Sequence, residues 1–90
     1  MDLDSIRKDI DQIDQELVAL LEKRMVCVGQ IAEYKEQKGL PVLDQGRERA
    51  VLEKVGSLVM DEQYRSTIQA QFQDMMKHSR TYQEEVRARA

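Results

Sequence analysis

The sequence is short of the residues on which many functional classes depend. Its 90 residues hold one cysteine, one histidine, one proline and four glycines. The single Cys27 excludes a disulfide framework within the chain, and with His78 as the lone histidine a zinc site is not expected. No apolar run approaches the length that spans a bilayer, and the acidic start lacks the core of a signal peptide. We therefore expect a cytoplasmic protein with no metal and no membrane partner.

The chain also lacks an excess of charge of one sign. Charged residues make up 34% of it, the formal net charge is −3, and both signs are interspersed. This mixture argues against disorder driven by self-repulsion. Because no basic face or arm is segregated, nucleic acid is not expected as a partner. The length allows one small domain, which we place over residues 1–90, and Met1 directly before the first expected helix favours a complete small protein.

A seam of residues at alternating spacings of three and four runs through the first third of the chain. Such a heptad seam predicts one long helix over about 4–38, with Asp4 as its N-cap. Lys38-Gly39 followed by Pro41 is a typical helix stop. The seam consists of Leu3, Ile6, Ile10, Ile13, Leu17, Leu20, Arg24, Cys27, Ile31 and Tyr34. We expect Cys27 to be a small core residue.

Two further helices follow, and no strand signal is present. The second is predicted over about 44–60 with Asp44 as N-cap, and the third over about 62–86 after Asp61, with fraying beyond Gln83. The fold class is therefore all-α with three helices per chain. The residues expected to face inward are Val51, Leu52, Val55, Leu58, Val59, Tyr64, Ile68, Phe72, Met75 and Met76.

The length of the first helix predicts association. About 34 residues at 1.5 Å each form a rod of roughly 50 Å. A compact chain of this size has a radius of gyration near 12 Å and a diameter of about 30 Å. The apolar seam therefore extends beyond any core that its own chain can supply. We expect a second copy to cover it in an intertwined helical homodimer, although a plain coiled coil also satisfies this pattern.

Polar side chains interrupt the apolar stripe of each helix. Arg24 occupies the seam, and Lys35 lies about 20° around the helix from it and about 16 Å further along. Glu48 leads onto the side of the second helix that carries the apolar residues, and the inward stripe of the third helix continues into Ser79 and Gln83. Because isolated buried charges are costly, several of them pointing inward suggest a shared polar ligand or a mutually satisfied network.

Each of these residues also has a purely structural interpretation. Arg24 could set the register of a coiled coil, and Lys35 could be a solvated cation at the negative end of the helix dipole. Asp44 is an N-cap in either case. Glu48 with Arg47 could belong to a solvated ion-pairing face. The stripe could simply leave the core at Ser79 and Gln83, and Arg7 could pair with Asp11 or Asp14.

The ordered set of motifs resembles the all-helical chorismate mutases in their minimal monofunctional form. The resemblance runs from Leu3 to about Gln83 and includes the Arg-to-Lys spacing of the first helix and the Gly-Leu-Pro-Val turn. It also includes Asp-x-x-Arg-Glu-Arg at the start of the second helix and Ser-x-x-x-Gln on the third. The resemblance implies an intertwined homodimer that converts chorismate to prephenate in phenylalanine and tyrosine biosynthesis and uses no cofactor.

The family's reaction is an intramolecular [3,3] rearrangement that needs no nucleophile, metal or general base. By resemblance, Arg24 and Arg7 bind the two substrate carboxylates, and Lys35 and Gln83 donate to the ether oxygen. Glu48 accepts from the ring hydroxyl. The remaining polar lining is Asp44, Arg47 and Ser79. The catalytic set is thus Lys35, Gln83, Arg24 and Glu48.

The position of Arg7 adds a geometric constraint. Arg7 lies about 25 Å along the first helix from Arg24 and about 42 Å from Lys35. No small molecule spans these distances, so an Arg7 that serves the same site must come from the other subunit. Two alternatives stay open beside the mutase: an isochorismate pyruvate lyase on the same scaffold, and a non-enzymatic helical dimerisation module in which Arg24 sets the register.

Overall fold

The computed structural model describes residues 2–89 and is built from helices alone. Helix α1 spans Leu3–Lys38, α2 spans Gln45–Leu58, and α3 spans Arg65–Arg89, with a short 3-10 turn, η1, at Glu62–Tyr64. No strand occurs among residues 2–89. The predicted all-α class with three helices is therefore confirmed.

The helix ends follow local chemistry, with three corrections to the prediction. Asp2, not Asp4, caps α1, because its side chain accepts from the Asp4 backbone amide. Gly39 ends the helix in the left-handed conformation with φ 66°, which glycine adopts without steric cost. Helix α2 begins after Asp44 as expected but ends at Leu58. Helix α3 does not fray beyond Gln83 and continues to Arg89.

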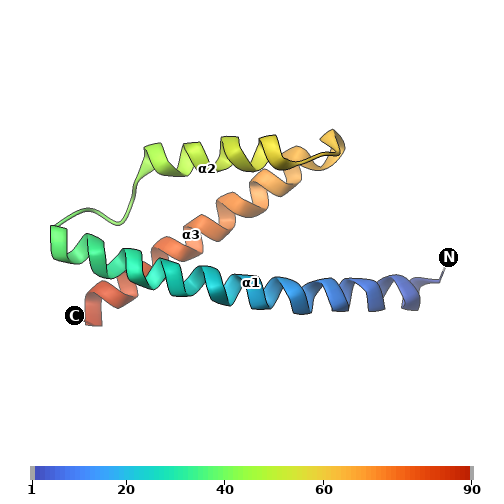
Figure 1. The fold of residues 1–90 in the computed structure, drawn as a ribbon, viewed down its shortest axis with the longest axis horizontal. Helices are drawn as coiled ribbons and strands as arrows, with labels where there is room; N and C mark the ends of the chain where they lie inside the picture. The colour runs from blue at the N-terminus through green and yellow to red at the C-terminus, as the bar shows by residue number, and fades with distance from the viewer. Residues whose placement is uncertain (1, 90) are drawn as a thin grey trace.

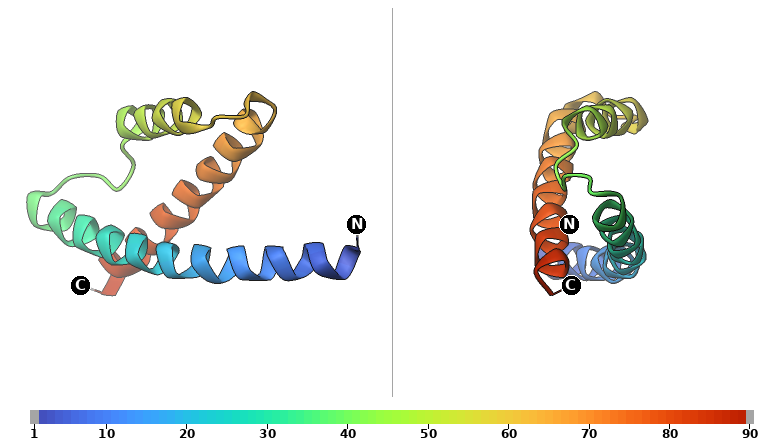
Figure 2. Two further views of the ribbon diagram at one scale, coloured as in Figure 1. Left: turned by 45° about the vertical axis from the view of Figure 1, so that its right-hand side comes forward. Right: turned by 90° about the vertical axis from the view of Figure 1, so that its left-hand side faces the viewer.

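Helix α3 connects the other two helices. It leaves the end of α2 and runs diagonally to cross the C-terminal half of α1 (Figure 1). Both α1 and α2 pack on α3 and not on each other, so the chain is open when it is viewed along α1 (Figure 2). Gln69 on α3 donates to the Leu52 carbonyl of α2 at 3.0 Å. An added Cβ at Gly56 would collide with this Gln69 amide, so a larger residue there would displace the Gln69 side chain from its hydrogen bond.

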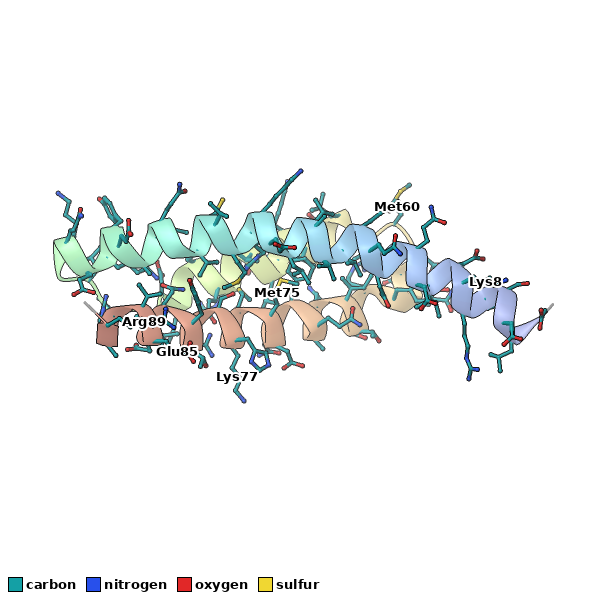
Figure 3. All side chains as sticks on the ribbon, turned by 90° about the horizontal axis from the view of Figure 1, so that it is seen from below. Lys8, Met60, Met75, Lys77, Glu85 and Arg89 are labelled. Carbon is teal, nitrogen blue, oxygen red and sulfur yellow. The ribbon has the colours of Figure 1, made fainter. Side chains whose placement is uncertain are left out.

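The first part of α1 has no partner within the chain. All residues from 2 to 23 are exposed, and we call residues 3–23 of α1 the arm. Lys8 lies on the arm beyond the turn at Met60 that joins α2 to α3 (Figure 3). The radius of gyration is 16.1 Å and the longest dimension 54 Å, against about 12 Å expected for the radius of gyration of a compact chain of this size.

The core within one chain is small. Its buried apolar residues are Val28, Ala32, Val42, Val55 and Met76.

Three residues expected to face inward are exposed: Cys27, Leu58 and Tyr64. The reason is the open architecture, because among residues 2–89 no neighbouring element buries these three side chains, although α3 packs on the second half of α1. Among residues 2–89, no helix is long and apolar enough to cross a membrane.

Candidate functional site

A cavity of about 350 Å³ lies where α1, α2 and α3 face one another. Its lining consists of Arg24, Cys27, Val28, Ile31, Lys35, Val42, Asp44, Arg47, Glu48, Val51, Met76, Ser79, Arg80 and Gln83. Seven of the eight site residues predicted from the sequence are in this set, and Arg7 is not. The helical spacing of α1 brings Arg24, Val28, Ile31 and Lys35 to one face, so one helix supplies two cations and the apolar surface between them.

Arg24 is held against α3 by a serine. Its Nη1 donates to Ser79 Oγ at 3.0 Å, and the same hydroxyl donates to the Met75 carbonyl one turn earlier at 2.9 Å. Ser79 is only 6% exposed. Because a guanidinium carries five N–H donors, one bond to Ser79 fixes its position and leaves donors free for an anion.

Lys35 and Gln83 form the second polar pair of the cavity. Lys35 Nζ donates to the Val42 carbonyl at 2.6 Å and to Gln83 Oε1 at 3.2 Å. An ammonium has three donors, so one is left. Gln83 is 7% exposed, and its oxygen faces Lys35. We find no acceptor for its Nε2 among residues 2–89, so Lys35 and Gln83 together present free N–H groups to the cavity.

The α2 side of the cavity carries both carboxylates. Asp44 Oδ1 accepts from the Arg47 backbone amide at 3.0 Å, which is the N-cap of α2. Glu48 forms an ion pair with Arg80 of α3. Sequence reasoning missed Arg80. Its spacing of three residues from Gln83 puts both on one face of α3, and this spacing was the signal that could have found it.

The charges of the lining favour an anionic ligand. Arg24, Lys35, Arg47 and Arg80 give four positive charges against the two negative charges of Asp44 and Glu48, which leaves a net charge of +2.

Apolar side chains such as Val28, Ile31 and Val51 fill the space between the charged groups. No histidine lines the cavity, and residues 2–89 hold no group of three or more His, Cys, Asp or Glu that could bind a metal. The arrangement can therefore bind a small dianion with an apolar body and donate fixed hydrogen bonds to it.

Arg7 lies on the exposed arm and is not part of the lining of this cavity. Along α1 it is about 25 Å from Arg24. A single chain thus assembles the cavity without Arg7.

Comparison with known proteins gives a consistent result. Residues 6–84 match the family model described as chorismate mutase type II. A chorismate mutase of Methanocaldococcus jannaschii is 30% identical over 84 residues, which are 92% of this chain and 85% of that protein.

Longer relatives match over part of the chain. The T-protein of Haemophilus influenzae is 41% identical over 51 residues, 57% of this chain and 14% of its own length. A bifunctional chorismate mutase/prephenate dehydratase of Aquifex aeolicus is 39% identical over 54 residues, 60% of this chain and 15% of its own length. No solved structure matches the chain.

Proposed function

This chain belongs to the chorismate mutase type II family, and from that premise we propose how its cavity carries out the rearrangement of chorismate to prephenate. The activity is that of a chorismate mutase, an isomerase, and its substrate is chorismate. The name of one longer relative joins a chorismate mutase to a prephenate dehydratase, and we propose that the activity of this chain serves phenylalanine and tyrosine biosynthesis. The observation that carries the proposal is the pair of free donors on Lys35 and Gln83 inside a cavity of net positive charge.

The rearrangement breaks a C–O bond while it forms a C–C bond within one molecule, so the protein has two tasks. It must hold the substrate in its reactive conformation, and it must stabilise the negative charge that develops on the ether oxygen. We assign the first task to Arg24, whose planar guanidinium binds a carboxylate through two parallel hydrogen bonds. The second task falls to Lys35 and Gln83, which donate to the ether oxygen.

The remaining polar residues orient the substrate. Glu48 accepts from the ring hydroxyl, because an ionised carboxylate is an acceptor only. Lys35 also reaches a substrate carboxylate, and Asp44, Arg47 and Ser79 complete the lining. Apart from the Arg47 side chain, each of these groups is already held by a neighbour before the substrate arrives, and such preorganisation avoids reorganisation during the reaction.

We further propose an intertwined homodimer. A folded monomer of this mass typically exposes roughly 5,400 Å², whereas this chain exposes 7416 Å². The excess is about 2,000 Å² per chain and about 4,000 Å² per pair, which lies in the range of obligate dimers. The arm supplies much of the apolar part of this surface through Ile10, Ile13 and Leu17, which are all exposed in the single chain.

In this dimer the arm of one subunit brings Arg7 to the cavity of the other, where it binds the second carboxylate of chorismate. Two equivalent sites result. The cytoplasmic location expected from the sequence stays a prediction.

The first test is purified protein with chorismate, followed by the ultraviolet absorbance of the substrate and chromatography of the product. We expect prephenate, and we expect Arg24→Ala to abolish its formation while the dimer is retained. Pyruvate release from isochorismate without prephenate formation would favour the lyase alternative. If neither substrate reacts, the polar cavity is a structural network and the dimerisation module becomes the better interpretation.

Subunit mixing tests whether Arg7 of one subunit serves the cavity of the other. Arg7→Ala and Arg24→Ala homodimers should both be nearly inactive. Heterodimers refolded from a mixture should regain one working site of two, because one cavity then has both arginines intact. A lack of recovery despite proven subunit exchange would exclude Arg7 from the partner's site.

A further inference from the structure

The ion pair between Glu48 and Arg80 has no role in the assignments above. It joins the two helices that face each other across the cavity, with Glu48 on α2 and Arg80 on α3. The side chains are 24% and 32% exposed, so water screens the pair less than it screens a surface pair. Among residues 2–89, Glu48 pairs with Arg80 and with none of the other three cations that line the cavity.

The ion pair opposes a repulsion between the Glu48 carboxylate and an anionic ligand in the cavity. A cavity that binds a dianion and also presents a carboxylate brings like charges together, and their repulsion favours rotation of the glutamate toward solvent. Arg80 opposes this rotation, because its guanidinium is anchored on α3 and binds one carboxylate oxygen, Oε1. The second oxygen, Oε2, keeps its lone pairs and is available to an outside donor.

We propose that Arg80 is a positioning residue that holds the Glu48 carboxylate in place for the ring hydroxyl of the substrate. Arg80 acts through Glu48 and not through a contact of its own with the substrate. This inference rests on the proposed function, since it assigns an orienting partner to a residue of the same site. It predicts that the contribution of Arg80 to kcat/KM disappears when either the Glu48 carboxylate or the substrate hydroxyl is removed.

The test is a double-mutant cycle with Arg80→Gln, Glu48→Gln and the double variant, measured as kcat and KM for prephenate formation. We expect Arg80→Gln to lower kcat/KM about tenfold, the size of one charge-assisted hydrogen bond. The double variant should be no less active than Glu48→Gln alone, because Arg80 then has no carboxylate to hold. Arg80→Lys should recover most of the activity. Lys77→Gln, which removes a cation that points away from the cavity on the same helix (Figure 3), is the matched control.

A second substrate gives an independent readout. With a chorismate analogue that carries hydrogen in place of the ring hydroxyl, wild type and Arg80→Gln should have equal kcat/KM within about twofold, because the group that Glu48 serves is missing. If Arg80→Gln does not fold, as thermal unfolding would reveal, Arg80→Met replaces it in the cycle and on the second substrate, because it removes the charge and keeps most of the aliphatic stem.

Two results would overturn this inference without affecting the proposed function. The first is a double variant whose loss of kcat/KM is the product of the two single losses, which means that Arg80 binds the substrate directly. The second is an Arg80→Gln variant with full activity. An unsubstituted protein that forms no prephenate would overturn the proposed function, and this inference with it.

Discussion

The two halves of α1 share one helical register and have opposite roles. On the arm, the seam positions are aliphatic, as at Ile10 and Ile13, and no part of the same chain covers them. In the second half the seam contains Arg24, which α3 holds through Ser79, and the face ends at Lys35, which Gln83 holds. A continuous helix thus changes within one turn from an uncovered apolar seam, the proposed association surface, to the lining of the cavity, at the point where α3 crosses it (Figure 1).

The role of a seam position depends on which segment packs against it. An aliphatic residue without cover requires a partner of like chemistry, because its burial against another apolar surface is what stabilises it. A cation in the same stripe is tolerated where another segment supplies acceptors, as Ser79 of α3 and the Val42 carbonyl of the loop between α1 and α2 do. The following variants test each half separately.

The largest effect is expected from charge on the arm. Ile10→Glu together with Ile13→Glu places carboxylates in the proposed interface, and burial of an unpaired charge costs several kcal/mol. The dissociation constant of the dimer should rise by about 10³-fold or more, since each tenfold step corresponds to about 1.4 kcal/mol. Sedimentation equilibrium measures the change, and prephenate formation should fall in parallel as Arg7 is withdrawn.

The matched control adds the same two charges on the opposite side of the arm, as Gln12→Glu and Gln15→Glu. This variant should remain dimeric and active. If both pairs behave alike, the seam is not the interface.

The second-largest effect, a loss of activity, is expected from removing the hydrogen-bond donor Lys35 in the second half of α1. Lys35→Ala removes an ammonium that is already oriented, and the loss of one such donor typically costs about 10²–10³ in kcat. The dimer should be unaffected, because Lys35 contacts its own chain. Lys38→Ala, which removes a cation from the same last turn of α1, is the control and should keep full activity. Equal losses in the two variants would argue against a specific role for Lys35.

A smaller and pH-dependent effect is expected at Gln83. In Gln83→Glu the carboxylate can accept from Lys35 but cannot donate to the ether oxygen, so activity near neutral pH should fall at least about tenfold. Protonation restores a donor, and the activity of this variant should therefore rise as the pH is lowered. Wild type has a neutral amide there and should show no such rise. Gln73→Glu, an exposed position on the same helix, controls for the added charge, and a flat profile in Gln83→Glu would contradict the assigned donor role.

The smallest effect concerns the last turns of α3. Arg87 Nη2 donates to the Leu40 carbonyl at 2.7 Å, two residues before the Val42 carbonyl that accepts from Lys35. Arg87→Ala should remove about 1 kcal/mol of stability, which lowers Tm by about 4–8 °C in a domain of this size. Since the loop supports Lys35, kcat/KM should also fall about threefold. Arg89→Ala is the control and should change neither quantity, because the Arg89 side chain is exposed and pairs with Glu85 on its own helix.

The parts of the fold that depend on neighbours in sequence could be predicted from it. The heptad seam and the Gly39 stop define α1 within a single stretch of chain, and Asp44 caps α2 through an amide three residues away. Helical periodicity also singled out five of the residues that line the cavity, which are Arg24, Lys35, Glu48, Ser79 and Gln83, whereas Arg47 was added only by the resemblance to a known family. The resemblance to a known family supplied their roles, which periodicity alone could not.

The features that were missed depend on contacts between distant segments. Arg80 joins the site through Glu48, 32 residues earlier in the chain, and this pair exists only because α2 packs on α3. The end of α3 was expected to fray because its composition is polar, but Arg87 reaches a carbonyl 47 residues away. Leu58 and Tyr64 were expected inside because periodicity identifies an apolar face without identifying what covers it.

The exposed arm also has a consequence for the order of folding. Most of the stability of a helix in a protein comes from packing of its apolar face, and residues 2–23 are all exposed in the single chain. If the proposed dimer forms, the segments around α3 can fold in a first-order step, whereas the arm gains its stabilising contacts only when two chains meet. Refolding should therefore show a slow phase whose rate rises with protein concentration, and activity should return with that phase.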